Sequence, residues 1–249
     1  ALLAGTLMNY VGIAVTLAIA SCINLLCSLL FLKILSINKS QKNPSVQFNF
    51  KLFSNYISDI KQGFFYIFSN KLILYSSLAA SLIFPFMQAL NVLIAPFNYR
   101  LLNGNDLTLG IVDSAIGLGS LISVSFCVLT PFKKVPLLLV ASGLILIVLT
   151  VIFPMSNNYL IAFANYALIG IFMGNIKVMS KSLVYEYIET FYVGRTMTAI
   201  SMLGLILAII YSMFIGLIGE ENISFAYYAL ATTLLIPIIF TILGHRKLI

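Results

Sequence analysis

The sequence predicts an all-α membrane protein, on three observations. The 249 residues are 61% hydrophobic and only 8% charged, whereas a soluble domain carries about 25% charged residues. Apolar runs of about 20 residues, the length that a helix needs to cross a bilayer, recur along the chain. The basic residues fall in the gaps between these runs, which is the pattern that orients membrane helices.

The elements are expected in the following order. Residues 1–8 have the pattern of a helix tail, and residues 9–12 that of a tight turn. Seven full spans follow, each near the length that crosses a bilayer. Their predicted ranges are Ile13–Leu32, Leu72–Ile94, Leu109–Leu129, Pro136–Met155, Leu160–Met179, Thr198–Ile218 and Phe225–Leu243.

The connections between the spans predict the orientation. When alternate gaps are placed on opposite sides, thirteen of the 14 lysines and arginines share one side and only Arg100 falls on the other. Since cytoplasmic loops are enriched in basic residues, the first side is expected to be cytoplasmic, together with the C-terminus. The protein is therefore expected to be a multi-pass protein of the cell membrane, in contact with the lipid bilayer.

The longest gap, residues 36–70, has two parts. A polar linker is followed by apolar residues at three- and four-residue spacing, which predicts an amphipathic helix in the cytoplasmic interface. A helix that binds a soluble partner is the alternative. The apolar positions are Phe53, Tyr56, Ile57, Ile60, Phe64, Ile67 and Phe68, and polar residues that include Asp59, Lys61 and Gln62 take the other face.

The span at Leu72–Ile94 contains Pro85, Gln88 and Asn91. Proline kinks a helix, and the two amides share a face because they are three residues apart. A bent helix with an amide face suits the wall of a substrate cavity. The alternative is interhelical hydrogen bonding that only holds the bundle together.

Asp113 is the one acid predicted inside a span, in its first turn. An ionisable group in a membrane helix is a functional candidate, here for carrying a proton or pairing with a cationic substrate. Stabilisation of the helix N-terminus through the macrodipole is the alternative. Asn165, in the span at Leu160–Met179, is a further candidate for facing a cavity.

Small residues mark two seams where helices are expected to pack closely. Gly170 and Gly174 form a GxxxG pattern, and Gly204, Ala208, Ser212 and Gly216 make a ridge with a spacing of four residues. The ridge suits either a static contact or a helix that slides. The stretch from Lys181 to Arg195 also contains Glu186 and Glu189, and charge pairs within it are a candidate gating contact, with a solvated loop as the alternative.

Several function classes lack their motifs. The sequence has no Walker-type phosphate loop, no HExxH and no nucleophile elbow, so neither an ATP-driven pump nor an enzyme is expected. There is no potassium-type filter sequence. The three cysteines and one histidine have no metal-ligand spacing, so neither a metal nor another cofactor is expected. The basic charge serves orientation rather than nucleic-acid binding.

Three stretches carry a resemblance to a known family. Asp59–Ile67 followed by Asn70, Lys71 and Leu72 resembles the entry to the seventh helix of major facilitator superfamily transporters, in their bacterial drug, macrolide and siderophore exporter branch. Leu109–Ser120 resembles the eighth helix. The pair Gly194 and Arg195 resembles the end of the loop before the eleventh.

The resemblance implies a domain organisation. Residues 1–35 would be the end of an N-terminal transporter half, with the tail of helix five and helix six. Residues 36–70 would be the linker between halves, and residues 71–249 the C-terminal six-helix half of a major facilitator-type bundle. The missing N-terminal half of the same protein would then be the principal partner of this portion.

The function that the resemblance implies is secondary-active, proton-coupled efflux of a small amphipathic compound, drug-like or metallophore-like, by alternating access. Gln88, Asn91, Asp113 and Asn165 are then the candidates for the substrate cavity, and Asp113 for proton coupling. A membrane partner or scaffold protein without transport activity, or a truncated remnant of a transporter, is the alternative function.

Overall fold

The computed structural model describes residues 2–37, 50–131 and 134–244. In these ranges the chain is almost entirely helical and has no strand, which confirms the all-α prediction. Seven helical segments are long and apolar enough to cross a membrane, as predicted. The α-helices are α1 (Leu2–Val11), α2 (Ile13–Ile37), α3 (Phe50–Ser69), α4 (Lys71–Pro96), α5 (Asp106–Leu129), α6 (Val135–Ile152), α7 (Tyr159–Tyr187), α8 (Val193–Glu221), α9 (Ile223–Thr233) and α10 (Leu235–Gly244).

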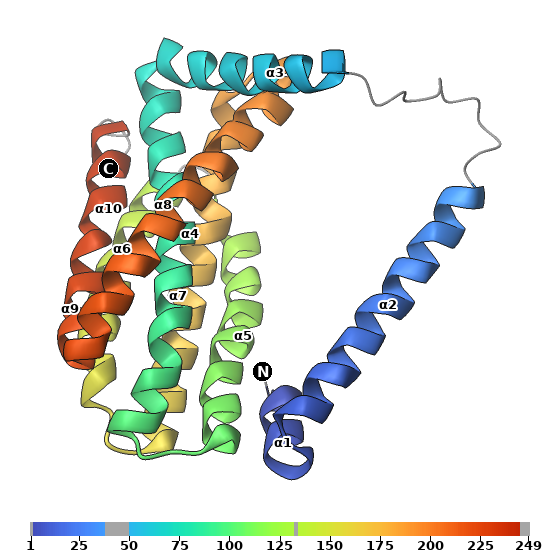
Figure 1. Ribbon diagram of the computed structural model, residues 1–249. Helices are drawn as coiled ribbons and strands as arrows, with labels where there is room; N and C mark the ends of the chain where they lie inside the picture. The colour runs from blue at the N-terminus through green and yellow to red at the C-terminus, as the bar shows by residue number, and fades with distance from the viewer. Residues whose placement is uncertain (1, 38–49, 132–133, 245–249) are drawn as a thin grey trace.

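Helices α4 to α10 form one bundle in which successive spans run in opposite directions (Figure 1). Helix α3 lies across one end of this bundle, here named the α3 end, and packs on α8 and α4. The described cations Lys61, Lys71, Lys134 and Arg195 belong to the α3 end or its connections.

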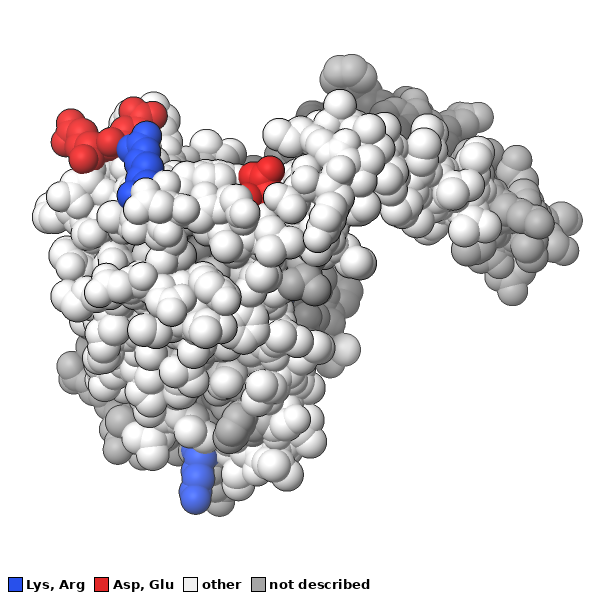
Figure 2. Space-filling view, turned by 90° about the horizontal axis from the view of Figure 1, so that it is seen from below, with Lys and Arg blue, Asp and Glu red and all other residues white. Residues whose placement is uncertain are grey.

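The opposite end of the bundle carries Arg100, whose Nη1 donates to the backbone oxygen of Glu220 at 3.1 Å. Seen from this end, the surface is mostly uncharged, with acidic residues grouped beside a basic one (Figure 2). These five cations are thus divided between the two ends, four to one, whereas Lys177 and Lys181 lie along α7.

Asparagine begins four of the spanning helices. The side chains of Asn70, Asn105, Asn158 and Asn222 each accept a hydrogen bond from a backbone N–H in the first turn of the helix that follows. These bonds satisfy donors that have no partner within the helix. The four asparagines therefore fix where α4, α5, α7 and α9 start.

The last span is broken into α9 and α10. Pro237 has no N–H to offer the carbonyl of Thr233, which is the last residue of α9. The loss of this bond ends one helix and allows the next to begin two residues later.

The larger core contains an aromatic cluster toward the opposite end of the bundle. The rings of Phe97 and Phe153 are 4.4 Å apart between centroids, and Tyr166 and Tyr227 pack around them. A smaller core lies under α3, where Ile67 and Ile73 meet Val184 and Ile200. The two cores join α3 and the six spans into one body.

Helices α1 and α2 have a different setting. Helix α1 packs on α5, where a side chain on Gly5 would lie 2.7 Å from the Cα of Gly110. Gly12, with φ +85°, makes the turn into α2, a backbone conformation that glycine adopts without strain. Helix α2 then leads away from the bundle, and only 6% of its span is buried (Figure 1).

The ends of three elements differ from the sequence prediction. Helix α1 continues to Val11, so the turn is confined to Gly12. Helix α5 begins at Asp106, so Asp113 lies about two turns inside the helix rather than in the first turn. Helix α7 continues to Tyr187, so Lys181 lies on a helix and not in a loop.

Candidate functional site

A pocket of about 360 Å³ opens between α4, α7 and α8, and is here named the α4–α7–α8 pocket. Its size falls in the range of small-molecule sites. Its lining is largely apolar with a few polar groups. The lining residues are Ala80, Ser81, Ile83, Phe84, Met87, Lys177, Ser180, Lys181, Ile200, Ser201, Gly204 and Leu205.

A proline and a glycine shape one wall of this pocket. Pro85, inside α4, cannot donate to the carbonyl of Ser81, so that oxygen loses its helical partner. Gly204 of α8 faces the same oxygen, because a Cβ at this position would lie 3.2 Å from it. The absence of a side chain at Gly204 lets α8 approach the freed carbonyl.

Two lysines supply the positive charge of the α4–α7–α8 pocket. Lys177 and Lys181 are four residues apart on α7, so they lie one above the other on one face. Both are exposed, and neither makes a salt bridge with another residue in the described ranges. No acidic residue is among those that line the pocket. The pocket therefore combines an apolar wall with a cationic edge.

The predicted amide face of α4 lies next to this pocket and not in its lining. Gln88 is half-buried and Asn91 is exposed. The Nδ2 of Asn91 donates to the Oε1 of Gln88 at 3.2 Å, so the pair is joined within α4. Their role in a substrate cavity stays a prediction.

Asp113 and Asn165 lie elsewhere in the bundle. Asp113 is half-buried on α5, within electrostatic range of the buried Tyr166. The Nδ2 of Asn165 donates to the backbone oxygen of Leu149 on α6 at 3.4 Å. The described hydrogen bond of Asn165 is thus with α6, and among the described residues no hydrogen bond joins Asp113 or Asn165 to Gln88 or Asn91.

The glycines of the GxxxG pattern pack against α5. A Cβ on Gly170 would overlap the backbone oxygen of Ile116, and one on Gly174 would overlap the Oγ of Ser123. Gly119 of α5 makes an equally close contact with α7, because a Cβ on Gly119 would overlap the backbone oxygen of Ala167. Helices α5 and α7 therefore touch backbone to backbone, which the sequence predicted for one helix without identifying its partner.

The ridge on α8 packs against α4. Gly204 and Ala208 are buried, and Gly216 and Ser212 are half-buried. A Cβ on Gly216 would lie 3.7 Å from Val92, which is an ordinary contact. The ridge becomes looser from Gly204 toward Gly216.

Arg195 holds α3 to the start of α8. Its Nε lies 3.0 Å from the Oδ1 of Asp59, and its Nη1 donates to the Oε1 of Gln62 at 2.8 Å. Gly63 lies against the backbone oxygen of Arg195 so closely that a Cβ would overlap it. The charge partner of Arg195 in the described ranges is therefore on α3, not between Lys181 and Arg195 as one interpretation of the sequence had it.

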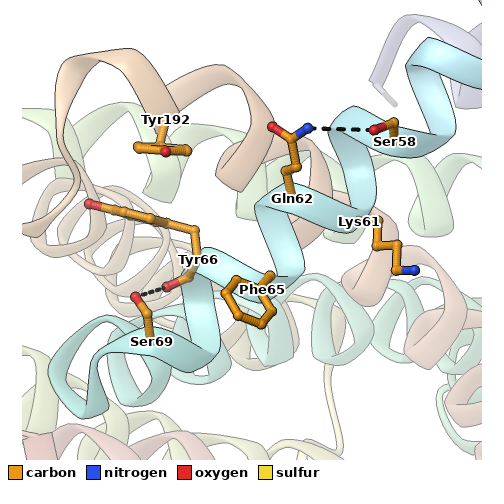
Figure 3. A pocket seen from close by; sticks show the side chains of 7 residues that line it. All are labelled: Ser58, Lys61, Gln62, Phe65, Tyr66, Ser69 and Tyr192. Atoms are coloured by element: carbon orange, nitrogen blue, oxygen red, sulfur yellow. Dashed lines mark hydrogen bonds between the residues drawn. The ribbon is translucent and has the colours of Figure 1, made fainter.

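Two tyrosines extend the contact between α3 and the connection from α7 to α8. Tyr66 stacks on Tyr192 with ring centroids 4.3 Å apart (Figure 3). The Tyr66 hydroxyl accepts a hydrogen bond from the backbone N–H of Glu189 at 3.2 Å. They line a shallow surface pocket of about 480 Å³ with other residues of α3. The periodicity of α3 did not predict this contact, because Tyr66 lies outside the apolar stripe of the helix and its partners are far away in the sequence.

The Asp59–Arg195 pair gives a first prediction. In a double-mutant cycle with Asp59→Asn and Arg195→Gln, we expect a coupling energy of about 0.2–1 kcal/mol, because both side chains are partly exposed. SDS-titrated unfolding in detergent measures it. The pair Lys61→Gln and Arg195→Gln serves as control and should show no favourable coupling. A coupling energy of zero for Asp59 and Arg195 would contradict the prediction.

Neither a family model nor a curated protein matches the chain.

Proposed function

We propose that this protein is a secondary-active membrane transporter that exports a small amphipathic compound by alternating access. The observation that carries the proposal is the α4–α7–α8 pocket, a space of small-molecule size between three spanning helices. Transporters of this kind hold substrate between helices within the membrane and expose it to either side in turn.

The resemblance of the sequence to major facilitator transporters supports the same function. On this proposal, residues 71–249 are the C-terminal six-helix half, and residues 1–35 end an N-terminal half that completes the transport path. The small buried fraction of α2 is consistent with such an N-terminal half, because α2 has a free surface on which further helices could pack.

The proposal includes an orientation in the cell membrane. The α3 end, with its surplus of basic residues, faces the cytoplasm, and so does the C-terminus. Helix α3 lies in the cytoplasmic interface. Its exposed face carries Ile57, Phe65 and Phe68 beside Lys61, a composition that suits the boundary between lipid and water.

The test is flux in proteoliposomes that contain the complete native protein. The substrates are tritiated decanoyl amides of taurine, ethanolamine and aminoethyl-trimethylammonium, which are amphipathic and differ in charge. We expect a proton gradient to drive at least one of them across the membrane. If none moves faster than in empty liposomes, the alternative of a non-transporting membrane protein holds.

Asp113 gives a second prediction within this test. We expect Asp113→Asn to lower gradient-driven flux by about tenfold or more, because a proton-coupled transporter needs an ionisable group that an amide cannot replace. Asp106→Asn, at the start of the same helix and beside Tyr99, is the control and should retain flux. Unchanged flux across pH in Asp113→Asn would remove this carboxylate from the coupling mechanism.

A further inference from the structure

We propose that the α4–α7–α8 pocket binds an organic anion, with Lys177 and Lys181 holding its negative group and α4 and α8 holding its apolar part. This inference rests on the proposed function and specifies the charge of the compound transported.

The depth of the two lysines supports an anion that enters the bundle. Lys181 and Lys177 lie six and ten residues before the end of α7, which is about 9 and 15 Å along the helix axis. A single lysine near a helix end can extend its ammonium group to the membrane surface. Both lysines here line the pocket from one face of α7, so their charges add to a positive potential at the pocket.

The charges around the pocket also favour a negatively charged ligand. The lining contains two cations and no acid, and neither lysine has a salt-bridge partner among the described residues. Both ammonium groups are therefore available to an incoming carboxylate, sulfonate or phosphate. Charge-assisted hydrogen bonds of this kind are about twice as strong as neutral ones.

The remaining walls fit the apolar part of such a ligand. Ile83, Phe84 and Met87 of α4 face Ile200 and Leu205 of α8 across the pocket. Ser201 supplies a hydroxyl group that can donate to an anion, whereas the Oγ of Ser180 donates to the backbone oxygen of Lys177 at 3.4 Å. An alkyl or aromatic body can therefore lie against these apolar side chains beside the two lysines.

Equilibrium binding of the three tritiated decanoyl amides to the purified complete protein, measured by scintillation proximity in a neutral detergent, tests the inference. We expect the taurine sulfonate to bind at least about tenfold more tightly than the ethanolamide or the trimethylammonium amide. Lys177→Gln/Lys181→Gln should remove this preference and leave ethanolamide affinity within about twofold. Lys177→Arg/Lys181→Arg should retain it.

The matched control is Lys71→Gln/Lys134→Gln, which removes the same charge from exposed lysines at the α3 end outside the pocket. It should bind the taurine amide as the native protein does. Equal affinity of the native protein for all three amides would overturn the inference, and so would unchanged taurine-amide binding in Lys177→Gln/Lys181→Gln. Displacement of the taurine amide by equimolar phosphatidylglycerol would also overturn it, by assigning the pocket to lipid.

The transport proposal and the anion-site proposal can be refuted independently of each other. Charge-selective binding that depends on Lys177 and Lys181, without gradient-driven flux, would contradict transport and leave the anion site in place. Gradient-driven flux that is indifferent to both lysines and to ligand charge would contradict the anion site and leave transport in place.

Discussion

Gly119→Ala is expected to destabilise the bundle by about 1–3 kcal/mol, the typical cost of overpacking a closely packed core. The added methyl group would overlap the backbone oxygen of Ala167 and lie 2.9 Å from the backbone nitrogen of Ile171. Both atoms belong to the helical backbone of α7, so neither moves without shifting the whole helix. Gly170 and Gly174 of α7 are packed equally closely against α5, so no free space beside Gly119 can accommodate the added methyl group.

The control for this substitution is Gly117→Ala on the same helix. No atom lies within 4 Å of a Cβ at Gly117, and alanine favours a helix over glycine by up to about 1 kcal/mol. We therefore expect opposite shifts: the apparent melting temperature in detergent falls for Gly119→Ala and stays or rises for Gly117→Ala. Equal shifts for the two variants would mean that α5 and α7 are not in backbone contact.

Gly63→Ala is expected to detach α3 from the bundle. Its methyl group would overlap the backbone oxygen of Arg195 and lie 2.7 Å from the carbonyl carbon. The contacts of Asp59, Gln62 and Tyr66 with the start of α8 depend on this close approach, so they weaken together. Overpacking of about 1–3 kcal/mol outweighs the exposed ion pair, which is worth about 0.2–1 kcal/mol.

Cysteine labelling measures this detachment. Ile67, on the buried face of α3, is 5% exposed. In protein lacking Cys22, Cys27 and Cys127, the thiol introduced by Ile67→Cys should therefore react slowly with a maleimide. Gly63→Ala should raise the labelling rate by about tenfold. Gly194→Ala, at a position with no atom within 4 Å of its Cβ, should not. Protection of the cysteine at position 67 in both variants would show that α3 holds its place without the Gly63 contact.

Composition and periodicity determined most of the fold. Each apolar run of bilayer length became helical, the last one as the two helices α9 and α10, since lipid leaves the backbone no other means to satisfy its hydrogen bonds. The amphipathic pattern before the first span of the six-span bundle became α3, for the same local reason. Helix ends were less predictable, because a cap such as Asn105, or the polar but helical continuation of α7 to Tyr187, depends on a few specific hydrogen bonds.

The candidate site shows where local pattern was insufficient. The sequence indicated that Gly170 and Gly174 pack closely. The spacing of Lys177 and Lys181 was visible too, but nothing local showed that both border a space against α4 and α8. Ser81 and Gly204 line the pocket from α4 and α8, and the space between these helices cannot be read from either segment of the sequence alone.

Local sequence was enough to predict which segments are helical, which are apolar enough to span a membrane, and which end of each span is basic. These properties depend on residues within a few turns of one another. Tertiary structure alone decided that Arg195 pairs with Asp59, that Gly119 faces Ala167, and that two lysines line one pocket. Those contacts join residues on separate helices, and the rotation of one helix against another is set by the packing of all their side chains together.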